Sequence, residues 1–319
     1  MKPKAHPEAV ALKIWTTYAL LAGCHPPPDV PPADALLADV AWLADPARAG
    51  RDAGSPGERA ADDWVAQRFA QLGLEPGGDR GTWFQDVPFG DATTRNVLGW
   101  VRGSQPDAGW LIVAAHVDHL GAGYPGADDN ASGVAGMLGI AAAAARWHPR
   151  HSILFVAFGA EERGLVGSRW LVAHPPRPAG LALAINLDMI GRSPFLGAKE
   201  YALGKMLAGI APGPGVGVLD SPRASQALAM ARAACAQLGL AIHAAEDFPH
   251  LEPQIRELAA DRSDDAPFAA AGIPTLFFST SLQDDYHQPT DTVDKIDRAT
   301  LHAITRAIWL TVQQVDRAR

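Results

Sequence analysis

Short apolar runs alternate along this chain with longer stretches in which apolar and polar residues recur at helical spacing. The apolar runs predict buried strands over 96–101, 110–117, 151–158, 181–190 and 274–279. The intervening stretches predict helices over 133–146, 165–173 and 223–238. Alternation of this kind is typical of βαβ units, and it indicates an α/β fold with a largely parallel sheet.

Further helices are predicted at both ends of this alternation. One spans 33–43, and a second spans 55–72, where Ser55, Pro56 and Glu58 form a capping-box arrangement at the start. A closing helix begins near Ala299, and its apolar residues fall on one face: Leu301, Ile304, Ile308, Val312 and Val315. The strands 96–101 and 110–117 are expected to be neighbours across a turn, whereas 192–222 is rich in Gly and Pro and is not assigned.

The composition describes one globular domain. Of 319 residues, 48% are hydrophobic and 19% charged, which is enough to bury a sizeable core. A net charge of −8 argues against a nucleic-acid partner, which would require a basic face. We find no internal repeat and no second domain, and we expect a monomer.

The N-terminal segment has the layout of an export signal. Lys2, Lys4 and Lys13 precede a short apolar segment that ends in Leu21-Ala-Gly-Cys24, which looks like a bacterial lipobox. Residues 1–32 are therefore predicted to be a lipoprotein-type signal and Pro-rich tether, and 33–319 the catalytic domain. We expect an exported protein that contacts the membrane only through lipid on Cys24 and faces the periplasm. Without the lipid, the protein would be free in the periplasm or secreted. The alternative is an ordinary helix with a chance cysteine.

The other cysteine, Cys235, lies in a helical pattern and is expected to be a buried core residue rather than a nucleophile. If Cys24 carries lipid, no disulfide can form within the chain.

Acidic and imidazole side chains follow almost every predicted strand. His116, Asp118 and His119 end one strand, and Glu161-Glu162, Asp188 and 284–287 follow others. The carboxyl ends of parallel strands meet at one edge of a sheet, and this edge is where such folds bind ligands. Each group alone could be a helix cap or a solvated surface charge. Together they would repel one another unless cations lay among them, and His with carboxylates is the ligand set of zinc.

The motifs occur in a recognisable order. They are His116-Val-Asp118, Asp128-Asp129-Asn130-Ala-Ser-Gly133, Glu161-Glu162-Arg-Gly-Leu-Val-Gly-Ser168, Asn186-Leu-Asp188-Met-Ile-Gly191 and Tyr286-His287. In this order they resemble the co-catalytic di-zinc aminopeptidases, metallopeptidase family twenty-eight of clan MH. The resemblance runs from about Leu36 to the C-terminus. It implies a three-layer α/β/α sandwich around a twisted, mostly parallel mixed sheet, in the compact form without an inserted domain.

The resemblance also implies a role for each matching residue. One zinc ion would be held by His116 and Asp188, a second by Glu162 and His287, and Asp129 would bridge the two. Asp118 would orient His116 through its other ring nitrogen. Glu161 would act as general base toward the metal-bound water.

Tyr286 and Arg262 match oxyanion and substrate-binding positions of the family. At Asp265, after Arg262-Ser263-Asp264, many relatives have His. This departure bears on the polarity of the pocket rather than on metal binding.

The implied function is a zinc-dependent exopeptidase acting on peptide or aminoacyl substrates, with aminopeptidase favoured. Two alternatives stay open. Glutaminyl-peptide cyclases share this fold but use one zinc ion, and a peptidase-like binding module would have lost its catalytic residues. Substrate preference is expected to depend on 192–222 and 240–262, and the acids and histidines of 240–262 are expected to lie on a solvated loop.

Overall fold

The computed structural model describes residues 28–177, 180–193, 215–280 and 282–318. Within these ranges nine strands form one mixed sheet in the order β1-β3-β5-β4-β6-β9-β7-β8, with β2 paired to β3. The strands are β1 (Glu75–Pro76), β2 (Phe84–Phe89), β3 (Ala92–Val101), β4 (Trp110–His116), β5 (Ser152–Phe158), β6 (Leu181–Leu187), β7 (Gly215–Asp220), β8 (Ala241–Ala244) and β9 (Thr275–Ser279). The central strands β5, β4, β6 and β9 run parallel.

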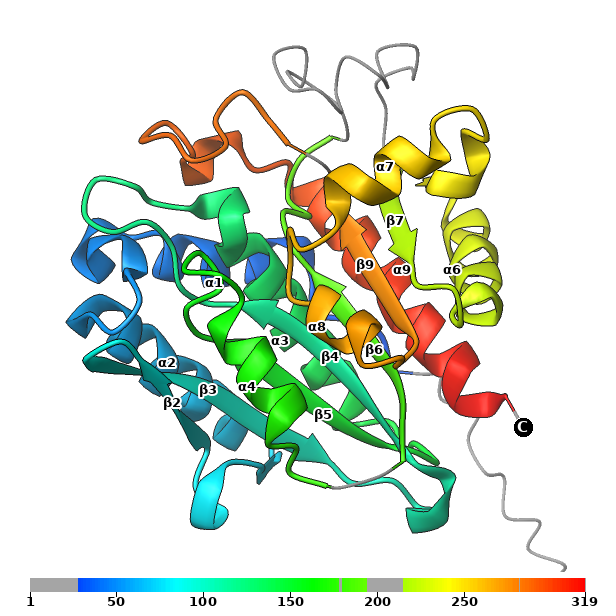
Figure 1. Cartoon of the computed structure of the whole chain (residues 1–319), viewed down its shortest axis with the longest axis horizontal. Helices are drawn as coiled ribbons and strands as arrows, with labels where there is room; N and C mark the ends of the chain where they lie inside the picture. Colours follow the sequence, from blue (N-terminus) through cyan, green and yellow to red (C-terminus); the bar gives the residue numbers. More distant parts are fainter. Residues whose placement is uncertain (1–27, 178–179, 194–214, 281, 319) are drawn as a thin grey trace, which may run out of the picture.

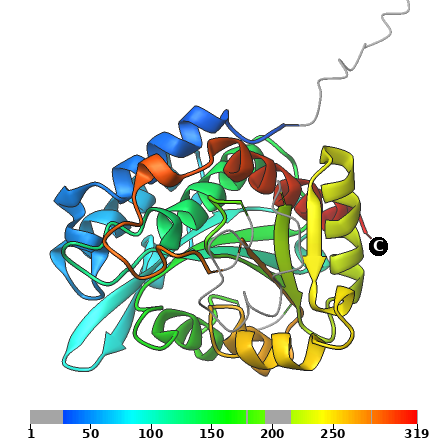
Figure 2. The same ribbon diagram turned by 90° about the horizontal axis from the view of Figure 1, so that it is seen from above.

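Helices cover both faces of this sheet, as Figure 2 shows from above. One face packs against α1 (Ala33–Leu43), α2 (Pro56–Gln71), α3 (Gly133–Ala144), α6 (Ser225–Leu238) and α9 (Arg298–Arg317). The other packs against α4 (Val166–Ala173) and α8 (Ala266–Ala270), while α7 (Glu252–Ala259) lies near β7 (Figure 1). The three-layer α/β/α fold class predicted from the sequence is confirmed.

Strand β4 illustrates why the central strands are mostly apolar on both sides rather than alternating. Leu111, Val113 and Ala115 point into the core beneath α3 and α9. Ile112 and Ala114 point into the second core, beneath α4 and α8. A strand covered on both faces has no side for polar residues, so the charged residues are confined to its end.

Most predicted elements are present, but the pairing of the first two predicted strands is wrong. β3 and β4 are not neighbours, because β5 lies between them, antiparallel to β3 and parallel to β4. Residues 240–262 are not a single solvated loop either, since they contain β8 and α7. Strand 181–190 ends earlier, at Leu187, and β7 falls in the unassigned 192–222 segment.

The helix caps and the closing helix follow the sequence pattern closely. Ser55 Oγ accepts a hydrogen bond from the Glu58 amide, as predicted. The Glu58 carboxylate, however, accepts from the Gly54 amide rather than from that of Ser55. In α9 the predicted apolar face packs into the core.

The N-terminal predictions for Lys2 to Cys24, including the lipobox, lie outside the described residues, as does most of 192–222. Of the predicted tether, Val30 packs into the core and the Pro28 carbonyl accepts a hydrogen bond from Trp309 Nε1 at 2.7 Å. A domain boundary at residue 32 therefore stays a prediction. No helix within the described ranges is both long and apolar enough to cross a membrane.

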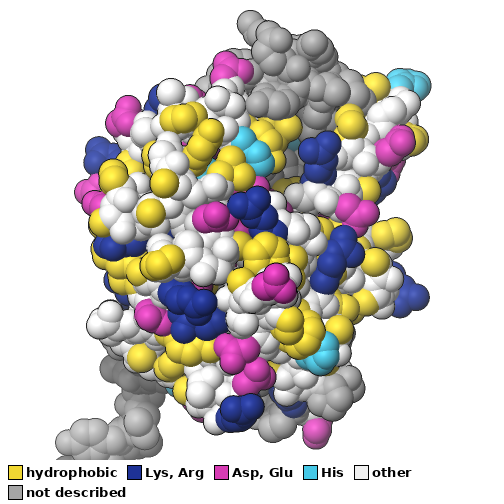
Figure 3. All heavy atoms as spheres, turned by 60° about the vertical axis from the view of Figure 1, so that its left-hand side comes forward, with side chains coloured by type: hydrophobic (Ala, Val, Ile, Leu, Met, Phe, Trp, Pro, Cys, Tyr) yellow, Lys and Arg dark blue, Asp and Glu magenta, His cyan; other side chains and the backbone are white. Residues whose placement is uncertain are grey.

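Cys235 lies on α6 and is fully buried in the hydrophobic core, which agrees with the structural role expected for it. On the face of the molecule drawn in Figure 3, basic and acidic side chains are interspersed and no continuous basic area is visible.

Candidate metal centre

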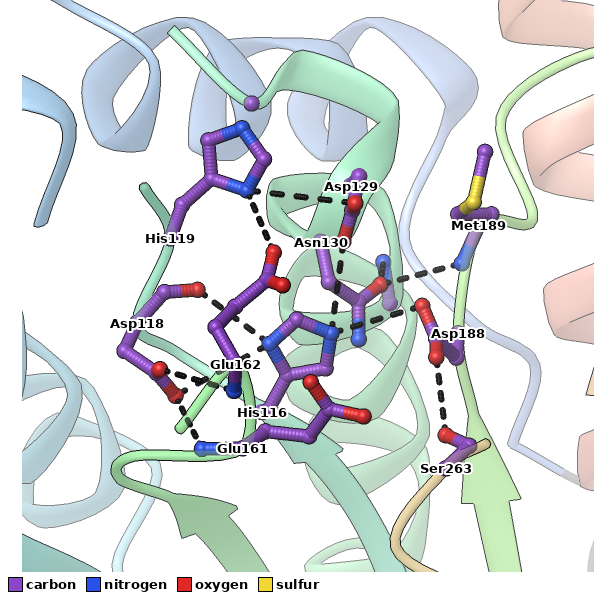
Figure 4. A network of polar contacts seen from close by, with 12 residues as sticks. His116, Asp118, His119, Asp129, Asn130, Glu161, Glu162, Asp188, Met189 and Ser263 are labelled. Carbon is purple, nitrogen blue, oxygen red and sulfur yellow. Dashed lines mark hydrogen bonds and ion pairs between the residues drawn. The ribbon is translucent and has the colours of Figure 1, made fainter. Parts of the chain in front are cut away.

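The ends of three parallel strands bring the candidate residues together. β4 ends at His116, β5 is followed by the turn with Glu161 and Glu162, and β6 is followed by Asp188. Because β5, β4 and β6 are adjacent and parallel, these ends meet at one edge of the sheet (Figure 4). Asp129 reaches the same place from the turn before α3, and His287 reaches it from the loop after β9.

His116 and Asp188 form a deeply buried half-site. His116 Nε2 lies 3.4 Å from Asp188 Oδ1 and 3.4 Å from Asp129 Oδ1. The other oxygen of Asp188 accepts a hydrogen bond from Ser263 Oγ at 2.7 Å, which turns Oδ1 toward His116. Glu161 also lies here, since His116, Glu161 and Asp188 each offer a possible ligand atom within 4.8 Å of the others. We call His116, Asp188 and Asp129 the buried half-site.

A second group forms around the other oxygen of Asp129. His287 Nε2 lies 3.2 Å from Asp129 Oδ2 and 3.0 Å from Glu162 Oε2. The side chain of His287 is 31% exposed, whereas that of His116 is 2% exposed. We call Asp129, Glu162 and His287 the open half-site. Asp129 therefore presents one carboxylate oxygen to each half-site, which is the arrangement expected of a bridging ligand.

Asp118 has a different set of contacts from the predicted one. Its carboxylate accepts hydrogen bonds from the amides of Glu161 at 2.9 Å and Glu162 at 3.2 Å. The His116 ring nitrogen Nδ1 lies 3.2 Å from the Asp118 carbonyl and 3.9 Å from its carboxylate. The backbone of Asp118 thus orients the imidazole, and the side chain holds the turn that carries both glutamates.

His119 belongs to the site although the motif order implied no role for it. Its Nδ1 lies 2.9 Å from Glu162 Oε1 and 3.8 Å from Asp129 Oδ2, and the residue is buried. With Oε1 engaged by His119, Oε2 of Glu162 remains directed at His287. The signal was present in the sequence, because His119 follows Asp118 in the same strand-end motif.

Tyr286 and Arg262 differ in how close the structure brings them to the ligands. The Tyr286 ring stacks on His287 with centroids 3.8 Å apart. Burial and the nearby Asp129 carboxylate raise the pKa of the Tyr286 phenol, so it stays protonated. Arg262 is exposed, and within the described residues its side chain forms no hydrogen bond or ion pair with the candidate ligands.

The electrostatics of the site favour bound cations. Burial raises the pKa of Glu161 well above its ordinary value, and Asp264 and Asp188 raise it further against the opposing charge of His116. Burial alone would lower the pKa of His116, but Glu161 and Asp188 outweigh it and raise that pKa well above normal. Against the effect of burial, contacts with the histidines lower the pKa of Asp129 and of Glu162. The site therefore holds more buried carboxyl groups than its imidazoles can balance, and a bound cation would supply the missing positive charge.

Buried atoms without hydrogen-bond partners point the same way. Asp129 Oδ2, Asp188 Oδ1 and His287 Nε2 are buried and have no hydrogen bond of acceptable geometry among the described residues. These atoms are imidazole nitrogens and carboxylate oxygens that face one another without hydrogen bonds. Zn²⁺ takes ligands of both types, so such a group of atoms suits it. The residues present therefore fit the metal that the motifs imply.

Besides His119, the buried carboxyl Asp264 lies near the candidate ligands although the motifs gave it no role. It is fully buried, and both of its oxygens lack a hydrogen bond of good geometry. Burial raises its pKa to about 7. Its position directly after Ser263, in the Arg-Ser-Asp triplet, was the available signal.

Comparison with known proteins agrees with this geometry. A family model described as Peptidase family M28 matches residues 96–312, which is most of the chain. The chain belongs to Peptidase family M28. Every candidate ligand lies within the matched residues, and the resemblance inferred from the motifs is confirmed.

Individual relatives are more distant. Leupeptin-inactivating enzyme 1 of Streptomyces exfoliatus is 29% identical over 80% of this chain and 50% of its own length. A probable lipoprotein aminopeptidase, LpqL, of Mycobacterium tuberculosis is 32% identical over 65% of this chain and 42% of its own. This M28 chain thus spans about half, or less, of these curated relatives.

Among solved structures, the zinc aminopeptidase BSAP of Bacillus subtilis aligns with a TM-score of 0.69 at 17% identity. The alignment covers 91% of this M28 chain and 98% of that protein. At this identity the likeness shows a shared fold.

Proposed function

We propose that this M28 protein is a zinc-dependent exopeptidase, with aminopeptidase favoured, that hydrolyses peptide or aminoacyl bonds. The observation that best supports the proposal is the geometry of Asp129, which turns one oxygen to His116 and the other to His287. Two such half-sites sharing one carboxylate suit a pair of zinc ions. The names of the relatives, among them aminopeptidases and zinc metalloproteases, favour the same activity.

In this proposal one zinc ion is held by the buried half-site and the other by the open half-site. Bound zinc would polarise the scissile carbonyl and make water a better nucleophile near neutral pH. His119 keeps Glu162 directed at the open half-site through its 2.9 Å contact. Ser263 does the same for Asp188 at the buried half-site.

Glu161 is proposed as the general base. It is adjacent to Glu162, but its carboxylate lies not at His287 but beside His116 and Asp188, where it could reach a water molecule held between the half-sites. Burial holds its pKa well above that of an ordinary glutamate, in the direction that a base working near neutral pH requires. It takes a proton from the attacking water and can deliver it to the departing amine.

Two further residues complete the proposed chemistry. Tyr286, protonated and stacked against His287, can donate a hydrogen bond to the oxygen on which negative charge develops. Arg262, exposed on the loop before Ser263, is proposed to contact substrate. The Asp118 carboxylate accepts hydrogen bonds from the amides of both glutamates, and so fixes the position of the base, Glu161, relative to the ligand, Glu162.

The test combines metal analysis with a substrate panel. The purified full chain should hold about two zinc ions and release N-terminal residues from aminoacyl anilides and short peptides. About one zinc ion per chain, with cyclisation of N-terminal glutamine and no hydrolysis, would instead identify a cyclase. Full metal loading with no turnover of any substrate would favour a binding module.

We also propose that the protein is exported and anchored through lipid on Cys24. The Leu21-Ala-Gly-Cys24 motif supports this, as does the name of the lipoprotein relative. Each buried methylene of an acyl chain adds about 0.8 kcal/mol of membrane affinity. Cys24→Ser should move the protein from the membrane fraction to the soluble fraction, while Cys235→Ala, the matched control, should not. A wild-type protein found in the cytoplasm would refute the proposal.

A further inference from the structure

Arg192 lies four residues after Asp188 and connects three segments of the candidate site. The residue is 9% exposed. One guanidinium nitrogen donates to Asp285 Oδ2 at 2.7 Å, and the other terminal nitrogen donates to Asp291 Oδ1 at 2.7 Å. A single buried side chain thus holds two carboxylates that come from the long connection between β9 and α9.

The first of these carboxylates supports the bridging residue. Asp291 accepts hydrogen bonds from the backbone amides of Asp128, at 3.0 and 3.1 Å, and of Asp129, at 3.0 Å. In addition, the Asp128 carboxylate accepts from the Gly191 amide at 2.8 Å, next to Arg192. The Asp291 carboxylate therefore links the backbone amide of Asp129 to the guanidinium of Arg192.

The second carboxylate supports His287, the partly exposed ligand. Asp285 precedes His287 by two residues, and it also accepts hydrogen bonds from Thr290 Oγ1 and Lys295 Nζ. These contacts fix the part of the loop that lies next to His287. That loop otherwise lacks the strand or helix that holds each of the other candidate ligands close to its place.

We propose that Arg192 is a positioning residue that fixes His287 relative to Asp129 and thereby sets the zinc affinity of the open half-site. The inference rests on the metal centre proposed above. Asp129 and His287 come from segments far apart in sequence, and Arg192 joins them through Asp291 and Asp285. The guanidinium fork is essential, because it can donate to two carboxylates at fixed angles. A lysine keeps the charge but cannot reproduce both bonds.

The first experiment titrates Zn²⁺ into the metal-free full chain. Arg192→Lys and Arg192→Gln should weaken one of the two zinc-binding events by about 10–100-fold, and leave the other within about threefold. The matched control is Arg232→Gln, since Arg232 also bridges two carboxylates, Glu246 and Asp247, but on α6 away from the site. Two zinc-binding events of wild-type affinity in a folded Arg192→Lys protein would overturn the inference.

A second experiment needs no metal. Hydrogen exchange of the Asp128 and Asp129 amides in the metal-free protein reports the Asp291 contact directly. Arg192→Lys should speed this exchange while the exchange of amides in β4 stays unchanged. Asp285→Asn, which cuts only the branch to His287, should weaken the same zinc-binding event without speeding exchange at Asp128 and Asp129.

The two measurements separate this inference from the proposed function. A wild-type chain that binds a single zinc ion would refute the two-metal centre, whereas the exchange experiment would still test the support of Asp129 by Arg192. Unchanged exchange in Arg192→Lys would overturn the inference even if the enzyme holds two zinc ions.

Discussion

The two half-sites use the same ligand types but are held in place in different ways. His116 and Asp188 sit at or directly after strand ends in the middle of the sheet, and the His116 side chain is only 2% exposed. His287 lies on a loop after the last strand, and its side chain is 31% exposed. Packing against two cores fixes the first half-site, whereas polar contacts between loops fix the second.

The surrounding charges differ in the same way. Beside the buried half-site, burial and neighbouring carboxylates raise the pKa of Asp264 to about 7 and of Asp265 to about 8. Beside the open half-site, burial would raise the pKa of Asp285, but hydrogen bonds from Lys295, Thr290 and Arg192 lower it to about 2. The acids beside the buried half-site, Asp264 and Asp265, are therefore stabilised by a proton or a nearby cation. Beside the open half-site, Asp285 is already paired with basic side chains.

The largest expected effect separates the paired glutamates. Glu161→Gln keeps the size of the side chain but cannot accept a proton, so turnover should fall by about 10²–10⁴-fold while both zinc ions stay bound. Glu162→Gln should instead weaken zinc binding at the open half-site, and added zinc should restore part of the rate. Steady-state kinetics with metal titration on both variants measures this. Metal loss in Glu161→Gln with full occupancy in Glu162→Gln would reverse the two assignments.

A second prediction compares the imidazoles. His116→Ala removes the fully buried imidazole that faces the buried Asp129 and the partly buried Asp188, so the metal-free protein should lose about 3–5 kcal/mol of stability. His287→Ala removes a partly exposed imidazole and should cost less, because His116 still faces Asp129 and His119 still faces Glu162. Each variant should lose zinc from its own half-site alone. Urea unfolding of the metal-free proteins, with metal content after dialysis, provides the measurement. Equal losses of stability would remove the distinction between a buried and an open half-site.

The smallest predicted effect tests the crowded acids. The pKa of Asp265 is raised from an unfolded value of about 4 to about 8, chiefly by burial. Its contribution to stability is therefore complete at acidic pH and is lost as pH rises toward 8. Asp265→Asn should match wild type near pH 4 and exceed it near pH 8, by about 1–3 kcal/mol.

Asp91→Asn, on an exposed turn, is the control for this prediction and should change stability at neither pH. The measurement is the free energy of unfolding of the metal-free proteins as a function of pH. A variant at Asp265 that is less stable than wild type near pH 8 would contradict the raised pKa.

Much of the fold could be predicted because a strand buried on both faces appears in the sequence as a run of apolar residues. Strands β4 and β5 are apolar except for His116, which ends β4, and Ser152, which begins β5, and the glutamates follow the end of β5. The order of strands could not be predicted, since nothing in the chain between 101 and 110 excludes a hairpin. β5 lies between β3 and β4, and its side chains fill both cores, as those of β4 do. The order of the strands is therefore set by the packing of the whole sheet.

The candidate ligands could also be predicted from local features of the sequence, but the residues that hold these ligands in place could not. A residue type placed at a strand end, such as Asp188, is visible along the chain, and the motif order links it to its family. The contacts of Asp118 with two amides, of His119 with Glu162, and of Arg192 with Asp291 join residues 43 to 99 positions apart.

The sequence by itself determined the fold class, the family and the residue types at the sheet edge, because periodicity and motif spacing are local properties. Only the tertiary structure decided that Asp129 faces two half-sites and that one of these is buried while the other is partly exposed. It also decided which buried acids have basic partners. These outcomes depend on distances between segments that chain connectivity leaves free, and they are set only when both cores have packed.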